Sequence, residues 1–427
     1  MLTAGVSQLD ITPPLGTHMR GYFEERTAST VHDPLYVRSF ALEDSGAAVA
    51  VAVCDVIGIE RKYLDQAKAR ISETTGLPPD QVLISCTHTH TGPQIGDDAY
   101  TEWLWARIAD GVRIAWQARE SAQVGWARTA EERLVFNRRY RMADGSVQTN
   151  PGVGNPDVVE PAGPTDPEVG VMVLRRGEGQ TLGLLSNYAL HYVGIPDDFT
   201  ALSADYYGFF STLIQQLRGQ RFVAALSNGA SGDINNINVM GRVSNRNDRY
   251  QHCERAAALV AANALWAWNE ADFVEEAPLG SALGELTLSP RPPATAEDLV
   301  QAQEIEDRLA AGKPVLMGER SFQRRVRRFA ENPPTARDTV VQALRIGDLA
   351  LVGVPGEFFA ELGLEIKRRS PFAQTMVLEL ANDWVGYIPS LRAFEDGAYE
   401  PNSSPYVPGF GESIVETAVG LLEGLRG

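Results

Sequence analysis

Short apolar runs alternate along the first part of the chain with segments of helical spacing. The Val-rich run at residues 47–59 is typical of a buried strand. Residues 62–76 then have the spacing of an amphipathic helix that ends at Gly76, a residue type favoured just beyond helix ends. Residues 81–90 predict a second buried strand and residues 99–118 a second helix. This order of elements predicts an α/β core.

The same alternation continues through the rest of the chain. Residues 181–194 predict a strand ending near His191, and residues 221–236 predict a strand that runs into a polar Gly/Asn loop. Further elements follow: a long Ala-rich helix over 249–271, two strands around a Gly-Asp turn over 339–359, and a last helix over 411–425. We expect an α/β fold with a mixed central sheet and helices on its faces.

Residues 294–334 differ from their surroundings. They are charged, helical in pattern and poor in glycine, and an Asn-Pro-Pro stretch ends them at Pro334. We predict a helical hairpin inserted in one catalytic domain that spans residues 1–427. The hairpin is either a lid or a subunit contact through which the chain forms a homo-oligomer, or a simple exposed excursion.

Charge and composition restrict the possible partners. The chain has 427 residues, of which 44% are hydrophobic, and a formal net charge of −17. Such an acidic chain repels nucleic acid and anionic membranes, and its densest basic stretch, residues 320–329, has the pattern of a solvated helix face. No apolar run is long enough for a membrane span, and the N-terminus does not have the pattern of a signal peptide. We therefore expect a cytoplasmic protein with a small-molecule substrate.

Three cysteines occur, at Cys54, Cys86 and Cys253, without a CxxC motif. This is too few for a disulfide framework, so we expect three free thiols.

The stretch "ISCTHTHTGP" (residues 84–93) places two of the six histidines, His88 and His90, two positions apart. In a strand, residues i and i+2 point to the same side, so both rings would face one way. They would do so at the end of a buried strand, where open α/β sheets bind ligands. Imidazole serves as a metal ligand or in proton transfer. The alternative is a pair of hydrogen-bonded histidines without a catalytic role.

Two other residues extend this pattern. His191 ends another predicted strand, and Glu357 follows an apolar strand at a tight turn. Two histidines and one carboxylate with an open position form a familiar catalytic zinc set. The residues thus favour a zinc site at strand ends. Their spacing alone does not identify it, because a chain of this length offers such combinations by chance.

The order of seven sequence blocks resembles that of the neutral, non-lysosomal ceramidases. The blocks are "LDITPP", "VHDPLYVRSFAL", "SCTHTHTGP", "FNRRY", "FVAALSNGASGDINN", "RIGDLALVGVPGEFF" and "LANDWVGYIPSLRAFEDGAYE". They run from Asp10 to about Glu400, nearly the whole chain. The resemblance is to the family's N-terminal catalytic domain, and we expect its C-terminal accessory domain, secretion signal and lipid attachment to be absent.

This resemblance implies zinc-dependent amide hydrolysis and assigns roles to single residues. The implied zinc ligands are His88, His191, Glu357 and Tyr387. His90 would face the scissile group and move a proton, while Arg138 and Tyr399 would stabilise the oxyanion. Arg139, next to Arg138, is an alternative for that role.

One block departs from the family pattern. Where the family has a proposed catalytic serine after Gly-Asp-Val, this chain has Asn235, which cannot be an acyl nucleophile. Ser231 is close by but lacks the GxSxG context of a nucleophile elbow. We therefore expect attack by water, whose pKa zinc lowers toward about 7. Asp233 would orient a ligand histidine and Asn235 would bind the substrate carbonyl or amide.

The substrate class remains open at this stage. The strong negative charge and the polar loop containing Asn235 favour a soluble small amide over ceramide. The alternatives are a true ceramidase-like N-acylsphingosine hydrolase, a barrel-type hydrolase of the HxH kind, and a zinc-binding protein without activity. Too few histidines follow His90 to favour the barrel type.

Overall fold

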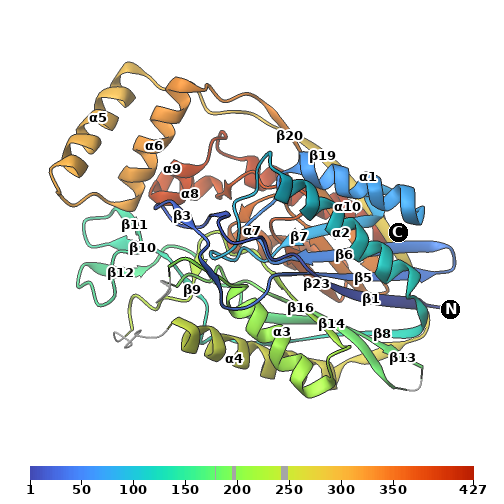
Figure 1. Cartoon of the computed structure of the whole chain (residues 1–427). Helices are drawn as coiled ribbons and strands as arrows, with labels where there is room; N and C mark the ends of the chain where they lie inside the picture. The colour runs from blue at the N-terminus through green and yellow to red at the C-terminus, as the bar shows by residue number, and fades with distance from the viewer. Residues whose placement is uncertain (178, 195–198, 242–248) are drawn as a thin grey trace.

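The structure is a computed structural model that describes residues 1–177, 179–194, 199–241 and 249–427. Two β-sheets pack face to face and helices cover the outer face of each, as Figure 1 shows. In spatial order, the strands of the large sheet are β16 (Val223–Asn228), β14 (Thr181–Tyr188), β13 (Glu168–Arg176), β8 (Glu120–Ala130), β1 (Thr3–Asp10), β5 (Tyr36–Asp44), β6 (Ala47–Cys54) and β7 (Val82–Cys86); β18 (Asp272–Val274) also pairs with β8.

The large sheet is mixed. β6 pairs with β7 in parallel and β14 with β16 in parallel, whereas the other neighbours are antiparallel. The prediction of a mixed sheet with helices on its faces is therefore confirmed. The second sheet contains β19 (Leu279–Leu288), β20 (Arg337–Ile346), β21 (Leu349–Gly353) and β23 (Gln374–Leu378). The predicted turn between β20 and β21 is present, with Gly347 at a φ of 64°.

Strict alternation of side chains makes both faces of the large sheet apolar. In β13, Val169, Val171 and Val173 face the helices, while Met172 and Leu174 face the second sheet. The second sheet contributes residues such as Leu351 to the same inner layer. Because both faces are buried, the strands read as continuous apolar runs in the sequence.

Pairs of helices cover the outer faces. On the large sheet, α1 (Arg61–Thr75) and α2 (Ala99–Gln117) cover one half, and α3 (Asp205–Arg218) and α4 (Arg249–Glu270) cover the other. α7 (Ala360–Arg369) and α10 (Phe410–Arg426) cover the second sheet. The predicted end of α1 is confirmed, since Gly76 has a left-handed φ of 79° and its N–H bonds to the Ser72 carbonyl.

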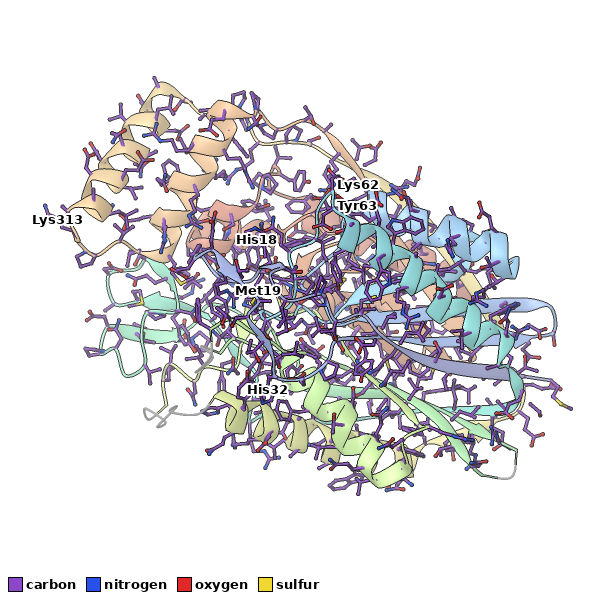
Figure 2. The ribbon with its side chains drawn as sticks, viewed as in Figure 1. His18, Met19, His32, Lys62, Tyr63 and Lys313 are labelled. Carbon is purple, nitrogen blue, oxygen red and sulfur yellow. The ribbon has the colours of Figure 1, made fainter. Side chains whose placement is uncertain are left out.

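Residues 294–334 form two antiparallel helices, α5 (Ala296–Ala310) and α6 (Met317–Glu331), at the end of the molecule opposite both termini (Figure 1). α6 packs on α9 (Tyr399–Ser403), which follows α8 (Leu391–Asp396). Figure 2 shows Lys313 at the outer turn of this hairpin and His18 and Met19 near the middle of the view.

Short strands complete the fold. They are β2 (His18–Met19) with β3 (Arg26–Thr27), β4 (Thr30–Val31) with β15 (Ala201–Leu202), β9 (Phe136–Asn137) with β17 (Ile234–Asn235), β22 (Glu357–Phe358) with β24 (Tyr387–Ile388), and the three-stranded β11 (Val147–Thr149), β10 (Arg139–Met142) and β12 (Val158–Pro161). A 3-10 turn, η1 (Pro79–Gln81), precedes β7.

Residues 379–382, which follow β23, connect the two edges of the large sheet. The Glu379 N–H donates to the Asn228 carbonyl at the end of β16 (3.1 Å). The Cys86 N–H donates to the Leu380 carbonyl (3.2 Å), and the Asn382 N–H donates to the Ile84 carbonyl (2.8 Å) in β7. This segment therefore brings the ends of β7 and β16 and the loop with Glu357 to one place.

The three cysteines are buried free thiols, as predicted. Cys54 and Cys86 face each other on neighbouring strands β6 and β7. Within the described residues, no helix has both the length and the apolar character that crossing a membrane requires.

Candidate metal centre

His88 and His90 lie in the loop after β7, not in the strand itself. β7 ends at Cys86, and His88 adopts a left-handed φ of 68°. The expectation that strand alternation aligns the two rings was therefore wrong, because the chain turns before it reaches them. The rings nevertheless lie close together, with centroids 5.0 Å apart, since the loop folds back on itself.

Asp205, at the start of α3, fixes this loop. Its carboxylate accepts the His90 N–H (2.9 Å) and lies 2.9 Å from the Thr89 hydroxyl and 3.1 Å from the Thr91 hydroxyl. Arg26 also donates to the His90 carbonyl (2.8 Å). The threonines on either side of His90 thus serve to hold the loop.

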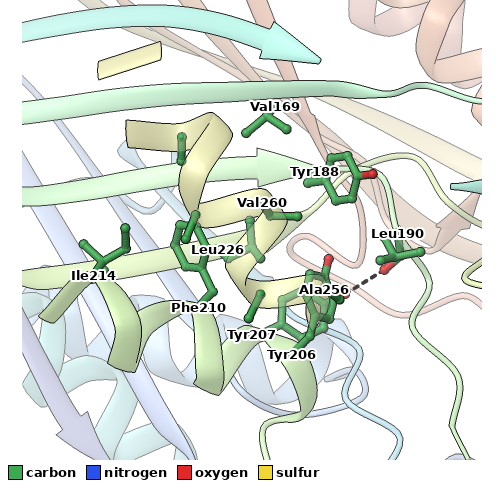
Figure 3. Close-up of a cluster of buried hydrophobic side chains, with 14 of the residues drawn as sticks. Val169, Tyr188, Leu190, Tyr206, Tyr207, Phe210, Ile214, Leu226, Ala256 and Val260 are labelled. Carbon is green, nitrogen blue, oxygen red and sulfur yellow. Dashed lines mark hydrogen bonds between the residues drawn. The ribbon is translucent and has the colours of Figure 1, made fainter. Parts of the chain in front are cut away.

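His191 lies three residues beyond the end of β14 and is held through its neighbours. The Tyr207 hydroxyl donates to the Leu190 carbonyl (3.1 Å), and the Tyr188 hydroxyl donates to the Glu131 carbonyl (2.6 Å). Figure 3 shows these tyrosines within the apolar cluster between α3, α4 and the sheet. The position of His191 therefore follows from core packing.

The three histidines converge into one buried cluster. One ring nitrogen from each of His88, His90 and His191 lies within 4.8 Å of the others, and the His90 and His191 Nε2 atoms are 2.9 Å apart. Glu357 Oε2 lies 3.5 Å from His88 Nε2 and 4.0 Å from His191 Nδ1. The Trp384 Nε1–H donates to the other oxygen, Glu357 Oε1 (3.3 Å).

The donor set fits a metal ion. The His88 Nδ1 lies 2.7 Å from the Ile57 carbonyl, which leaves Nε2 as the free nitrogen facing Glu357. Glu357 Oε2 is buried and has no regular hydrogen bond in the described part of the chain. Metal-binding histidines commonly donate their other N–H to a backbone carbonyl in this way. His88, His191 and Glu357 would hold the ion, and His90 is close enough to be a further ligand.

Charge pairing shifts the pKa values within the cluster in different directions. Burial opposes the charged form of His88, but Glu357 outweighs it and raises the His88 pKa. Burial likewise opposes ionisation of Glu357, yet His88 and Arg138 lower its pKa overall. For His191, burial and then the positive charge of Arg138 lower the pKa well below its usual value and favour the neutral ring. A neutral imidazole is the form that binds a metal.

Arg138 is the arginine that faces the cluster. Its guanidinium lies 3.5 Å from His191 Nδ1 and donates to the Gly232 carbonyl (2.7 Å). Its Cζ lies 5.3 Å from the ring centre of Tyr387 and 5.9 Å from that of Tyr399. Burial raises the pKa of Tyr387 well above its usual range, although Arg138 acts in the opposite direction.

Arg139 points away and supports the loop around α8 and α9. It donates to Glu400 (3.1 Å) and to the carbonyls of Gly397 (2.9 Å) and Ala393. Glu400 also accepts from Arg138 Nε (2.7 Å), so one buried carboxylate orients both arginines.

Three predicted or considered residues are engaged elsewhere. The Asp233 oxygens accept from the Ala360 N–H (2.8 Å) at the start of α7 and from the Asn137 side chain (2.7 Å), so the expected bond to a ligand histidine is not formed. The Asn235 amide donates to Asn150 (2.7 Å) and accepts from the Ile237 N–H (2.9 Å). The Ser231 hydroxyl donates to Glu379 (2.7 Å), not to a histidine.

The sequence interpretation missed the residues that support the ligands: Trp384, Glu379, Glu400 and the Ile57 carbonyl. Trp384 and Glu400 stand within a recognised block, three positions before Tyr387 and directly after Tyr399, and this proximity was an available signal. The Ile57 carbonyl belongs to the backbone and leaves no trace in a sequence.

Comparisons with known proteins identify relatives of this chain. The family model described as neutral/alkaline non-lysosomal ceramidase, N-terminal, matches residues 2–269, more than half of the chain. The neutral ceramidase of Pseudomonas aeruginosa is 23% identical over 99% of this chain and 72% of its own length. That of Drosophila melanogaster is 23% identical over 56% of this chain and 36% of its own length.

Two solved structures have the same fold. The crystal structure of neutral ceramidase from Pseudomonas aeruginosa has a TM-score of 0.75 at 19% identity and covers 99% of this chain and 75% of the other. A structure titled "Ceramidase complexed with C2" has a TM-score of 0.78 at 16% identity and covers 100% and 75%. The chain belongs to the neutral/alkaline non-lysosomal ceramidase family.

Proposed function

We propose that this protein is a zinc-dependent hydrolase that cleaves the amide bond of an N-acylsphingosine or a closely similar N-acyl lipid. Family membership supports hydrolysis of an amide bond. The observation that carries the proposal is that the side chains of His88, His191 and Glu357 converge in the interior, where one Glu357 oxygen has no regular hydrogen bond among the described residues.

The comparisons favour a different substrate from the one that charge and loop polarity suggested. Each of the relatives named above is called a neutral ceramidase, and the similarity to one of them extends over almost the whole chain. The N-acylsphingosine alternative therefore has better support than a soluble small amide. The acidic surface remains a feature of the protein, but it does not define what enters the site.

The residues around the cluster have separable tasks in this reaction. Zinc held by His88, His191 and Glu357, with Tyr387 as a further ligand, would supply Lewis-acid chemistry toward the carbonyl and water. His90, directly beside the cluster, takes a proton from water and passes it to the leaving nitrogen. Arg138, fixed by Glu400 and Gly232, and Tyr399 beside it donate to the developing oxyanion.

The test is metal content and turnover measured together. The purified chain should contain about one zinc, and a chelator should abolish hydrolysis of N-acylsphingosine in detergent, with recovery when Zn²⁺ is returned. His88→Ala and His191→Ala should each lose the metal and the activity. His18→Ala is the matched control, because His18 is exposed and lies outside the cluster.

Different results would separate the parts of the proposal. Full metal content in both cluster variants would contradict the ligand assignment. Bound zinc without turnover of any N-acyl amide would favour the alternative of a zinc-binding protein without activity.

A further inference from the structure

The basic stretch of α6 carries two kinds of arginine. On the side facing α5, Arg327 pairs with Glu306 within 2.6 Å. On another side, Arg320, Arg324 and Arg328 follow each other at intervals of four and share one face of the helix. In the described part of the chain, none of these three has a carboxylate within 4.0 Å. This corrects the view of the whole stretch as a solvated face balanced by its acidic neighbours.

Two of these arginines lie over the ring of Phe23, which is connected to the metal centre through contacts between aromatic rings. The Cζ atoms of Arg320 and Arg324 are 4.6 Å and 4.5 Å from the ring centre of Phe23. The Phe23 ring is 6.1 Å from that of Tyr399, which is 5.4 Å from that of Tyr387. The guanidinium groups are therefore separated from the proposed ligand Tyr387 by two aromatic side chains.

A fourth arginine approaches from the N-terminal loop. Arg20 Cζ lies 5.6 Å from the ring centre of Trp384, whose indole N–H donates to Glu357. Arg20 also acts electrostatically on Arg328: burial lowers the pKa of Arg328, Tyr406 opposes this, and Arg20 lowers it further. Among the described residues Arg20, too, has no carboxylate within 4.0 Å. We call Arg20, Arg320, Arg324 and Arg328 the arginine row.

The arginine row is held in place. The Arg325 Nε–H donates to the Asn402 carbonyl (2.9 Å), and the Ser321 and Ser403 hydroxyls are hydrogen-bonded to each other. Asn402 and Ser403 belong to α9, the helix that begins with Tyr399. The same contacts thus fix α6 and the residue beside the metal centre, so the row keeps its distance from the cluster.

Four guanidinium groups without carboxylate partners among the described residues offer their N–H donors to an anion. Each presents a planar set of N–H donors that matches a carboxylate or a phosphate. Like charges at this spacing repel one another, and partial burial and then Arg320 lower the pKa of Arg324. Glu24, next to Phe23, also acts on Arg324 but lies beyond 4.0 Å. In a chain of net charge −17, a local surplus of positive charge concentrates anions at this place.

We propose that the arginine row selects amide substrates that carry a carboxylate or a phosphate. This group would lie on the part of the substrate that extends from the metal centre toward α6. The inference rests on the proposed hydrolase function and adds that, among N-acyl amides, those with an acidic group are preferred over their neutral counterparts.

An anionic bilayer is the other anion that such a row could meet. The neighbouring helix argues against it, because α5 carries five carboxylates and one arginine in the segment AEDLVQAQEIEDRLA. A membrane surface would have to meet those carboxylates as well, whereas a single substrate group reaches the guanidinium groups alone.

Two matched pairs of substrates test the inference. In each pair the acyl chain is the same and only the charge differs: N-dodecanoylethanolamine with N-dodecanoylglycine, and N-hexanoylsphingosine with its 1-phosphate. The first pair tests a carboxylate and the second a phosphate. For at least one pair, the wild type should favour the acidic member about tenfold or more in kcat/KM, which corresponds to about 1.4 kcal/mol.

The variants locate the cause of that preference. Arg320→Gln/Arg324→Gln should lower the ratio of acidic to neutral substrate about tenfold, through KM and with little change in kcat. Arg320→Lys/Arg324→Lys should restore part of it. Arg327→Gln is the control, since it removes one charge from the same helix on the side paired with Glu306. Circular dichroism would show whether each variant is folded.

Each failure has a distinct meaning. A ratio that stays the same in the double glutamine variant overturns the inference and leaves the hydrolase function intact. If no amide is turned over, the hydrolase function fails, and calorimetric binding of the N-dodecanoyl pair decides: equal affinities overturn the inference. The double glutamine variant could also lose binding to phosphatidylglycerol vesicles while its substrate ratio stays the same. That result would assign the arginine row to a membrane surface and overturn the inference.

Discussion

Glu357 and Glu379 are two buried acidic side chains close to each other. Glu379 accepts the N–H of Phe358 (3.0 Å), the residue that follows Glu357. Their surroundings nevertheless differ. Glu357 faces His88 and His191 and is influenced by Arg138, and its pKa is lowered despite burial. Burial raises the pKa of Glu379 to about 8, although His88 acts in the opposite direction. The cationic partners, not the burial, make one of the two an anion.

Glu379 has three neutral partner residues. It accepts from the Asn228 side chain (2.9 Å), from the N–H and hydroxyl of Ser231 (3.0 and 2.7 Å) and from the Phe358 N–H. These bonds tie the end of β16 to the strand that presents Glu357. We infer that Glu357 binds the metal and that Glu379 positions it, and the following predictions test this division.

The largest effect should come from Glu357→Gln. An amide keeps the shape of the side chain but removes the negative charge that faces His88. We expect metal content well below one per chain and a loss of hydrolysis greater than the roughly 100-fold that changes at outer partners of metal ligands produce. Metal analysis and turnover measure both. Unchanged metal content would show that the three histidines bind the ion without Glu357.

His90→Ala should have the next largest effect. If His90 moves protons, the variant keeps its metal and loses roughly 10²–10⁴-fold in rate. The structure makes the test sharp, because His90 Nε2 is only 2.9 Å from His191 Nε2 and belongs to the same nitrogen cluster. Loss of metal in a folded variant would identify His90 as a ligand.

Glu379→Gln should have a weaker effect, because it would change only the position of Glu357. The new amide nitrogen would face donors that now point at the carboxyl oxygens, so the strand with Phe358 should shift. We expect metal affinity to fall by about 10–100-fold, with full activity regained at excess Zn²⁺. Activity that does not recover at any metal concentration would mean that Glu379 takes part in the reaction itself.

Much of this candidate site could be predicted from the sequence, because its proposed ligands follow the ends of predicted strands. An apolar run that ends in a polar turn precedes each of His88, His191 and Glu357 in the sequence. What could not be predicted is the loop geometry. β7 stops at Cys86, His88 takes a left-handed φ, and the loop from Thr89 onward is held by Asp205, which is more than a hundred residues away in the chain.

The choice between Arg138 and Arg139 shows a second limit. Neighbouring residues in an extended chain point to opposite sides, and either could face the site until Glu400 fixes both. The second sheet was equally hidden. Its strands β20 and β21 were recognised, but an apolar run does not state which sheet it joins.

The smallest effect concerns pH and tests whether Glu379 is neutral. Its folded pKa of about 8 exceeds the value of about 4.3 expected in the unfolded chain. Between these values the folded protein holds a proton that the unfolded protein releases, so the free energy of unfolding should fall as pH rises from about 4.3 to about 8. Urea titrations of chelator-treated protein would measure this slope. Glu379→Gln should flatten it, and an equal slope in the variant would show that Glu379 is already ionised.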